Sequence, residues 1–216
     1  MTRRSSGPLG EFEAIRLLAA RLGTRHGRGV RLGIGDDAAL LVAGRGMLVW
    51  TVDACLEGTH FERHLLELGD VAWKALNAAT SDLAAMGARP LAALSALELP
   101  PRVSRLELDA FARGQARAAR VLGCPVVGGN IAKGKRFNVT TTVLGVAEQP
   151  LRRDGARPGD EVWLIGDVGL AAAGLAILRG GRSVRGRAVE HAVRAWRRPR
   201  ALLREGAGLV GRATAA

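Results

Sequence analysis

The sequence has 216 residues, of which 48% are hydrophobic and 24% are charged. With a mean hydropathy of +0.09, this balance is that of a packed globular protein and excludes both a disordered chain and a disulfide-stapled miniprotein. The formal net charge of +12 comes almost wholly from arginine, since lysine occurs only at positions 74, 133 and 135. We attribute the charge to compositional bias, and the 4% of aromatic residues leaves little for stacking on nucleic-acid bases.

The N-terminal residues and the cysteines favour a cytoplasmic protein without disulfides. The positive charges near the N-terminus are not followed by an apolar block, because Glu11 and Glu13 interrupt it. The longest nearly uncharged apolar stretch, residues 169–178, is about half of what a bilayer span of ~18–20 residues needs, so we expect no membrane crossing. Cys55 and Cys124 lack any metal-binding spacing and are expected to be buried free thiols.

Hydrophobic periodicity predicts a mixed α/β layer fold for the first two thirds of the chain. In chain order the pattern indicates a helix over residues 11–22, two short strands over 38–42 and 47–52 joined by a turn at 44–46, a helix over 69–88, a strand over 91–99, a helix over 104–122, and strands over 125–127 and 137–147. The alternation of these elements predicts one sheet covered by helices.

The turn-rich run at residues 152–160 is the best candidate for a domain boundary. We therefore predict one domain over residues 1–148 and the start of a second α/β domain over residues 149–216. The second part is expected to hold a strand over 161–165, a helix over 170–178 and an arginine-rich helical stretch over 182–204. These elements are too few to close another sheet, so the second domain is expected to be incomplete.

Two acidic segments are candidates for metal binding. Asp36 and Asp37 are adjacent carboxylates in the run GIGDDAA, which fits either an acidic turn or a site for a hard cation. Thr51, Val52 and Asp53 lie at the predicted end of a strand, where α/β proteins often place functional groups.

Asp82 lies in the predicted helix over 69–88 and has two interpretations. On one, it continues the small apolar stripe of Val71, Ala75, Ala78 and Met86 and is a buried carboxylate that needs a cation. On the other, the helix is rotated so that the core stripe runs through Ala72, Leu76, Ala79 and Leu83, and Asp82 is merely near the helix end. The sequence leaves both open.

Three further segments are weaker candidates. His60 follows Asp53 by seven residues and is either structural or a ligand-binding group. Gly129 and Asn130 follow a buried run, where glycines permit a close approach of backbone N–H groups to phosphate, although a simple turn also accounts for them. Arg153 is either a phosphate-binding residue or a surface charge, and the chain contains neither a Walker motif nor a dinucleotide-binding glycine motif.

The order and spacing of these segments resemble the thiamine-monophosphate kinase family, within the superfamily that includes aminoimidazole ribonucleotide synthetase and selenophosphate synthetase. The most specific segments are the two runs GIGDDAA at 33–39 and SDLAAMGA at 81–88. The resemblance also covers GEFE at 10–13, TVD at 51–53, EGTHF at 57–61, AWKALN at 72–77, GGN at 128–130, RDGARPGD at 153–160 and AAAGL at 171–175. It extends over nearly the whole chain.

The resemblance implies a PurM-like N-terminal domain and ATP-dependent phosphorylation of thiamine monophosphate to thiamine diphosphate, with Mg²⁺ and no covalent intermediate. It implies that metal ions around the ATP phosphates are held by Asp37, Thr51, the backbone of Val52, Asp53 and Asp82. It also implies that His60 contacts thiamine monophosphate, that Gly129 and Asn130 lie along the nucleotide phosphates and that Arg153 pairs with them. The family forms homodimers through its N-terminal sheets, and neither a nucleic-acid nor a membrane partner is expected.

Two departures from the family pattern affect the expected activity. Many relatives carry Asp where this chain has Asn130, so one metal ligand is neutral and that metal is expected to bind more weakly. Relatives also continue into a further segment that supplies metal ligands and thiamine contacts, so a fragment or an inactive gene product is an open alternative. The remaining alternatives are a sibling ATP-using enzyme of the superfamily, a non-catalytic dimerising remnant and, least favoured, a nucleic-acid-binding module.

Overall fold

The fold is built on a four-stranded sheet. The structure, a computed structural model, describes residues 10–23, 30–32, 40–41, 45–181 and 185–216. The sheet has the strand order β3-β6-β4-β5, in which β6 is antiparallel to both neighbours and β4 is parallel to β5. Its strands are β3 (Met47–Leu56), β4 (Arg89–Leu99), β5 (Val126–Lys133) and β6 (Asn138–Ala147). A separate two-stranded antiparallel sheet is formed by β1 (Val30–Leu32) and β2 (Leu40–Leu41).

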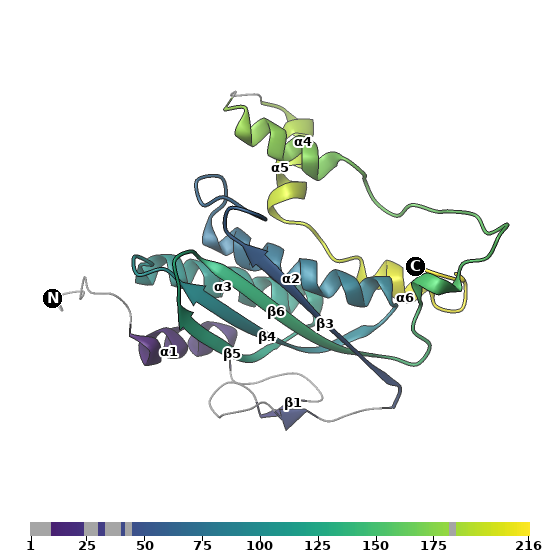
Figure 1. Cartoon of the computed structure of the whole chain (residues 1–216), viewed down its shortest axis with the longest axis horizontal. Coiled ribbons are helices and arrows are strands. Elements are labelled where there is room, and N and C mark those ends of the chain that lie inside the picture. Colours follow the sequence, from purple (N-terminus) through teal and green to yellow (C-terminus); the bar gives the residue numbers. More distant parts are fainter. Residues whose placement is uncertain (1–9, 24–29, 33–39, 42–44, 182–184) are drawn as a thin grey trace.

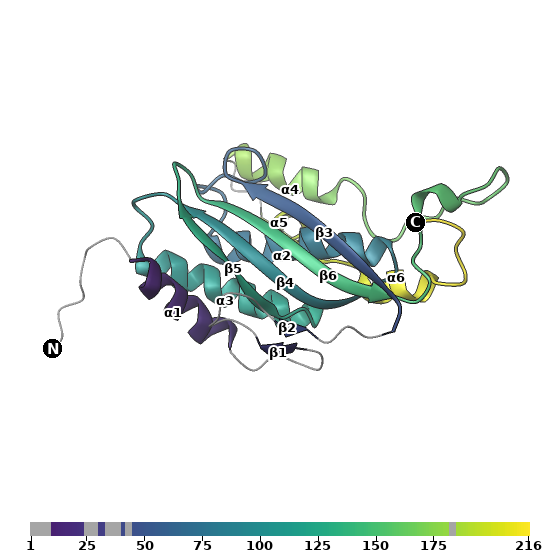
Figure 2. The same ribbon diagram turned by 60° about the horizontal axis from the view of Figure 1, so that its bottom comes forward.

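Three helices lie along one face of the four-stranded sheet, as Figure 2 shows. These are α1 (Glu11–Leu22), α2 (Leu68–Ala85) and α3 (Arg105–Leu122). The parallel pair β4 and β5 is connected through α3, as parallel strands require a crossover. α3 begins at a capping box, in which Ser104 and Glu107 satisfy each other's free backbone N–H groups. The predicted mixed α/β architecture is confirmed.

The buried side of α2 decides between the two interpretations of that helix. Ala72, Leu76, Ala79 and Leu83 are each completely buried, whereas Asp82 is exposed. The core stripe therefore runs through the rotated set, so the second of the two open interpretations is correct and the first, a buried Asp82 carboxylate, is wrong. Val71 and Ala75 of the other stripe are also buried, but that stripe leaves the core at Ala78 and Asp82, because the larger side chains of Leu76 and Leu83 gain more from burial there.

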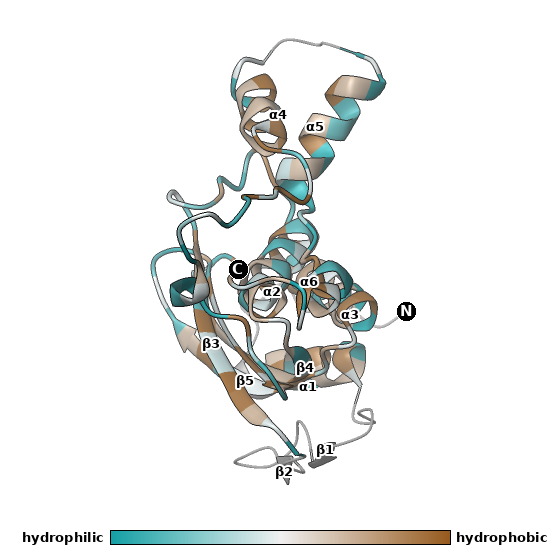
Figure 3. Ribbon diagram, turned by 90° about the vertical axis from the view of Figure 1, so that its right-hand side faces the viewer, coloured by the Kyte–Doolittle hydropathy of each residue, from teal (hydrophilic) through white to brown (hydrophobic). Residues whose placement is uncertain are grey.

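The opposite face of the four-stranded sheet carries large exposed apolar side chains. We define the open face by Leu48, Trp50 and Val52 of β3 and Leu94 of β4, of which Trp50 is 73% exposed. Figure 3 shows that the three helices lie on the other side of the strands. Isolated exposed apolar residues are ordinary, but a contiguous set on one sheet face marks an interaction surface.

Several strand limits differ from those predicted. β3 continues four residues past Val52, so Asp53 lies within the strand and not at its end. β5 continues through Gly129 and Asn130 to Lys133, so the predicted strand over 125–127 is too short and a simple turn at Gly129 and Asn130 is excluded. In both cases a neighbouring strand supplies hydrogen-bond partners over the whole length, and this pairing outweighs the low strand propensity of Asp, Asn and Gly. No strand was predicted where β1 lies.

The C-terminal part consists of a 3-10 turn and three helices. They are η1 (Arg153–Gly155), α4 (Leu170–Arg179), α5 (Arg187–Arg197) and α6 (Leu203–Leu209). Figure 1 shows α4 beside α5, and α6 close to the C-terminal end of α2. The arginine-rich stretch is divided between α5 and α6 because the chain leaves the helix at Arg198 and Pro199 follows.

The prediction of a strand over residues 161–165 is wrong. These residues have no regular structure, and Val162 and Trp163 are 100% and 82% exposed. The segment has the composition of a strand, but no described strand pairs with it, and a strand is stable only within a sheet. The division of the chain into domains at residues 148 and 149 stays a prediction.

One smaller expectation is confirmed. Cys55 and Cys124 are both buried free thiols. None of the helices in the described ranges combines the length and the apolar composition that a membrane span requires.

Candidate functional site

Thr51 and Asp82 come together where β3 passes along α2. The Thr51 hydroxyl donates to Oδ2 of Asp82 over 2.5 Å, and it joins two segments that are 31 residues apart in the sequence. The contact forms because Thr51 points from β3 toward the helices, while Asp82 lies on the exposed side of α2, outside the core stripe. A threonine hydroxyl and a carboxylate in contact at a solvent-accessible position offer oxygen atoms of the kind that hard cations bind.

Asp53 lies on the same face of β3 as Thr51, because side chains two residues apart in a strand point the same way. It is exposed, and the next residue on this face, Cys55, is buried. Burial raises the pKa of the Cys55 thiol, and the charge of Asp53 adds to this effect. Thr51, Asp53 and Asp82 thus carry oxygen atoms along the line where β3 lies beside α2, and we call this line the seam.

The remaining predicted metal ligands are less directly placed. Asp37, and the whole run of residues 33–39 that contains it, lies outside the described residues. The side chain of Val52 is on the open face, so only its backbone groups belong to the seam. Within the part of the chain that the structure describes, no three carboxylate, imidazole or thiol groups form a metal cluster.

His60 occupies a turn beyond the far end of β3. It is exposed, and its Nδ1 accepts a hydrogen bond from the backbone N–H of Leu56 over 3.0 Å. At about 3.4 Å per strand residue, Leu56 is about 17 Å along the strand from Thr51. His60 and the Thr51–Asp82 contact are therefore at opposite ends of the seam.

Gly129 and Asn130 lie on the other edge strand. Four residues pair in sequence across the sheet: Asp53 with Thr141, Thr141 with Ser95, and Ser95 with Gly129. Asp53 and Gly129 are therefore at the two ends of one row. Three strand spacings of about 4.8 Å separate the two edges. Asn130, one residue on, is exposed and points to the open face. The structure of one chain does not bring Asn130 together with Asp53 or Asp82.

Arg153 lies near the C-terminal end of α2. It is exposed on η1, two residues after Leu151, whose backbone N–H donates to the carbonyl of Met86 over 3.1 Å. Met86 is the C-terminal cap of α2 and follows Asp82 by four residues. The fold thus holds Arg153 at the same end of α2 as Asp82, although the two residues come from separate sequence motifs.

Lys74 and Cys55 occupy the middle of the seam. Burial raises the pKa of the Cys55 thiol to about 11, against the opposing charge of Lys74. Burial also lowers the pKa of Lys74, and the nearby Cys55 offsets part of that effect. The ammonium group of Lys74 lies 4.3 Å from the ring centre of Trp196 and donates to the carbonyl of Trp196 over 3.2 Å. A cation–π contact of this kind fixes the position of the lysine.

The residues that flank Lys74 on α2 bind a distant part of the chain, and no motif in the sequence predicted this role. Trp73 Nε1 donates to the carbonyl of Pro199 over 2.7 Å, and Asn77 Oδ1 accepts from the backbone N–H of Ala201 over 3.1 Å. Asp70 forms an ion pair with Arg198. These contacts hold the chain around residues 196–201 against α2. The sequence feature that could have predicted them is the spacing of residues 70, 73, 74 and 77, which places four polar or amphipathic side chains on one side of the helix. We call residues 196–201 the docked segment.

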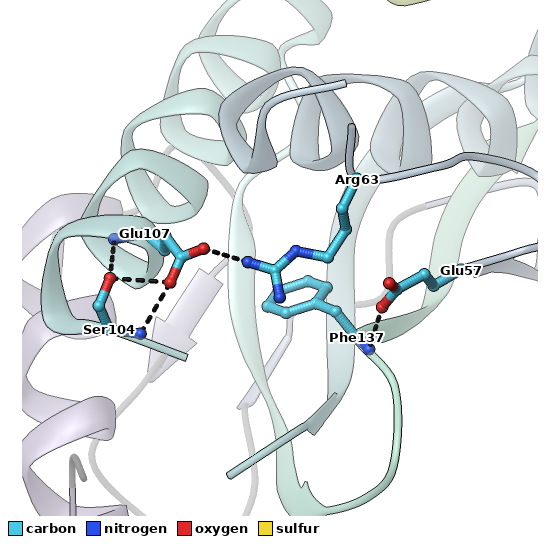
Figure 4. Close-up of polar contacts among 5 residues, drawn as sticks. All are labelled: Glu57, Arg63, Ser104, Glu107 and Phe137. Atoms are coloured by element: carbon cyan, nitrogen blue, oxygen red, sulfur yellow. Dashed lines mark hydrogen bonds and ion pairs between the residues drawn. The ribbon is translucent and has the colours of Figure 1, made fainter. Parts of the chain in front are cut away.

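A second polar network supports the turn that carries His60 (Figure 4). Oε2 of Glu57 accepts from the backbone N–H of Phe137 over 2.8 Å, and Arg63 forms an ion pair with Glu107. Burial raises the pKa of Glu107, but hydrogen bonds from Ser104 and the charge of Arg63 outweigh it, so the pKa is lowered. A cavity of about 310 Å³ beside the turn is lined by Glu57, Gly58, Glu62, Arg63, His64 and Arg136.

Comparison with known proteins places the chain in a family. Residues 35–147 match the model of "AIR synthase related protein, N-terminal domain". The thiamine-monophosphate kinase of Bacillus subtilis is 36% identical over 172 residues, which are 78% of this chain and 52% of the relative. That of Aquifex aeolicus is 36% identical over 170 residues, which are 79% of this chain and 53% of the relative. The chain thus spans about half the length of these curated relatives.

Solved structures show the same relationship. Thiamine-monophosphate kinase from Stenotrophomonas maltophilia superposes with a TM-score of 0.82 at 34% identity, over 96% of this chain and 66% of that one. A structure described as "AaThiL complexed with AMPPCP and TMP" superposes with a TM-score of 0.75 at 29% identity, over 100% of this chain and 66% of that one. The chain therefore belongs to the family of AIR synthase related proteins through its N-terminal domain, and its curated relatives are thiamine-monophosphate kinases.

Proposed function

We propose that this chain binds ATP and Mg²⁺ in a thiamine-monophosphate kinase, which phosphorylates thiamine monophosphate to thiamine diphosphate. The observation that carries the proposal is the contact between Thr51 and Asp82, with Asp53 on the same face of β3. This contact unites two segments by which the sequence resembles the family. The identity of the relatives, and the nucleotide analogue named for one of the solved structures, support the same conclusion.

The side chains of the seam fit a hard divalent cation. Thr51, Asp53 and Asp82 offer only oxygen atoms, which are the ligands that Mg²⁺ prefers. We propose that these three residues, the backbone of Val52 and Asp37 hold Mg²⁺ beside the nucleotide phosphates. When bound, the ion neutralises charge that develops on the transferred phosphoryl group. Asp53 and Asp82 are exposed, so both carboxylates are accessible to a hydrated ion.

The contacts of the nucleotide and the acceptor are assigned on the same basis. Arg153 lies at the Asp82 end of α2. We propose that its guanidinium group pairs there with phosphate oxygens of the nucleotide. His60 lies at the other end of the seam and is proposed to contact thiamine monophosphate. Gly129 and Asn130 are proposed to lie along the nucleotide phosphates. Since the chain supplies positioning and charge, direct transfer without a protein nucleophile is the expected reaction.

We further propose that two copies of the chain form a homodimer through the open face. Leu48, Trp50, Val52 and Leu94 give this face an apolar surface that the helices leave uncovered. Burying it against a second copy gains hydrophobic free energy, and the same patch on both chains suits a two-fold axis. Asn130 lies on this face, so a role for it at the nucleotide would place the nucleotide site beside the dimer interface. The cytoplasmic location stays a prediction.

The proposal is tested by incubating the purified chain with ATP, Mg²⁺ and thiamine monophosphate and measuring thiamine diphosphate. Binding of AMPPCP with and without Mg²⁺ is measured by titration calorimetry on the same preparation. We expect Mg²⁺-dependent binding of the analogue and, where the chain is sufficient for catalysis, the diphosphate product. Transfer only to a different acceptor would identify a sibling enzyme, and failure to bind AMPPCP with Mg²⁺ would reject the proposal.

A further inference from the structure

A row of polar side chains crosses the buried side of the four-stranded sheet. Asp53 of β3 is paired with Thr141 of β6, and Thr141 is paired with Ser95 of β4. Residues that pair across a sheet share one face, and for this row it is the face that the helices cover. α2 packs against both β3 and β6. The row therefore leads from the exposed edge that carries Asp53 into the core.

The hydroxyl of Thr141 lacks a partner within the described structure. Thr141 is completely buried, and its Oγ1 makes no hydrogen bond to any of the residues that the structure describes. Its neighbour Ser95 differs, because Ser95 Oγ accepts from the buried amide of Gln115 over 2.9 Å. A buried hydroxyl without a hydrogen bond destabilises the fold and calls for a specific explanation.

Packing alone does not explain a threonine at this position. The residues on either side of it on the same face of β6, Val139 and Val143, are also completely buried and are both valine. Valine has nearly the same shape as threonine and would fill the position without the cost of the hydroxyl. The hydroxyl is thus the one feature of Thr141 that the core does not use.

We propose that Thr141 is a positioning residue for Asp53, and this inference rests on the proposed function. The hydroxyl of Thr141 donates to the carboxylate of Asp53 when that carboxylate turns from solvent toward the seam to bind Mg²⁺. The cross-strand pairing brings the two side chains within reach of each other. Hydrogen bonds to a metal-binding carboxylate fix its orientation, so Thr141 would hold Asp53 on the side shared by Thr51 and Asp82.

The test compares Thr141→Val with Thr141→Ser and the wild-type chain. The apparent Kd for Mg²⁺ is measured at saturating AMPPCP, and the unfolding midpoint is measured without metal. We expect the valine variant to bind Mg²⁺ about tenfold more weakly, as is typical when a partner of a metal ligand is removed. Its unfolding midpoint is expected to equal or exceed that of the wild type, because a buried hydroxyl without a partner is removed. The serine variant is expected to regain most of the affinity.

A double-variant comparison separates positioning from a general structural role. If Thr141 acts through Asp53, then Thr141→Val has no further effect on Mg²⁺ affinity in an Asp53→Asn background. An equal loss in both backgrounds, or wild-type affinity in Thr141→Val, would overturn the inference and leave the proposed function standing. Absence of Mg²⁺-dependent binding in the wild-type chain would instead reject the proposed function. Should the valine variant not fold, Thr141→Ala is measured and interpreted in the same way.

Discussion

Cys124 is the more deeply buried of the two thiols. It lies between α3 and β5, is completely buried, and its backbone N–H donates to the carbonyl of Ala119 over 3.0 Å. Burial raises the pKa of its thiol from 9.0 to about 12. The folded state therefore holds the thiol proton more tightly than the unfolded state does.

This shift predicts a pH dependence of stability. The stabilising contribution of a raised pKa is fully present below pH 9.0 and is lost as the pH rises toward about 12. We expect the unfolding midpoint of the wild-type chain to fall more steeply between about pH 8.5 and pH 10.5 than that of Cys124→Ala. Thermal unfolding monitored by circular dichroism measures both slopes. Parallel slopes would contradict the assigned burial.

At the scale of single residues, the sequence was sufficient to identify the candidate side chains by their chemical type. It was not sufficient to predict the direction in which each side chain points. Asp82 was recognised as anomalous, but helical spacing alone admits two rotations of α2, and only the packing of Leu76 and Leu83 selects one. Thr51 and Asp53 were identified by their motif, although β3 runs past both. Thr141 was missed because a threonine in a strand is ordinary until its burial and its missing partner are known.

The crossing of α2 and α3 depends on two glycines. A Cβ atom added to Gly114 would lie 2.0 Å from the carbonyl oxygen of Gly69, which is much closer than real contacts permit. The helices approach each other closely here because neither residue has a side chain. This approach seats α2, and with it Asp82, against the sheet.

The close approach makes Gly114 sensitive to substitution. We expect Gly114→Ala to destabilise the fold by about 2 kcal/mol, because overpacking outweighs the better helix propensity of alanine. Gly208→Ala in α6 is the matched control, since an added Cβ there meets no atom within 4 Å. Urea unfolding of both variants gives the comparison. A Gly114→Ala variant as stable as Gly208→Ala would show that the helices do not cross this closely.

Besides carrying Asp82, α2 holds the docked segment in place. Trp73 donates to the carbonyl of Pro199, and replacing it with Phe removes this hydrogen bond together with part of the buried ring system. We expect Trp73→Phe to lower protection from hydrogen exchange in α5 and α6 by about fivefold, which corresponds to a hydrogen bond of about 1 kcal/mol. Amides of β4 are expected to be unaffected. Trp163→Phe is the control because Trp163 is exposed, and equal effects of the two substitutions would contradict the docking.

At the scale of elements, helices were predicted more accurately than strands. The predicted limits of α1 and α3 agree with the structure, because each has a strong apolar stripe and α3 also has a capping box. Strand limits depend on partners that the sequence does not reveal. β5 continues through two glycines because β4 pairs with it, whereas the more apolar residues 161–165 form no strand among the described elements.

At the scale of the whole molecule, the open face predicts self-association. We expect the chain to be dimeric at concentrations of about 10 µM or above and Trp50→Glu to be monomeric, because a charge in an apolar interface is costly. Leu106→Glu is the matched control, since Leu106 on α3 is 73% exposed, as is Trp50, but is remote from the open face. Light scattering after size-exclusion chromatography measures the masses. A dimeric Trp50→Glu variant, or a monomeric wild type, would contradict the proposed interface.

The central claim is that the Thr51–Asp82 contact and Asp53 hold a divalent cation beside a nucleotide. The most direct measurement is electron paramagnetic resonance of Mn²⁺, used in place of Mg²⁺, in the presence of AMPPCP. Asp82→Asn retains an acceptor for the Thr51 hydroxyl and removes only the charge. We predict that the wild-type chain binds Mn²⁺ with AMPPCP, and that Asp82→Asn binds it at least about tenfold more weakly with an unchanged unfolding midpoint. Equal binding by the wild type and the variant would contradict the account.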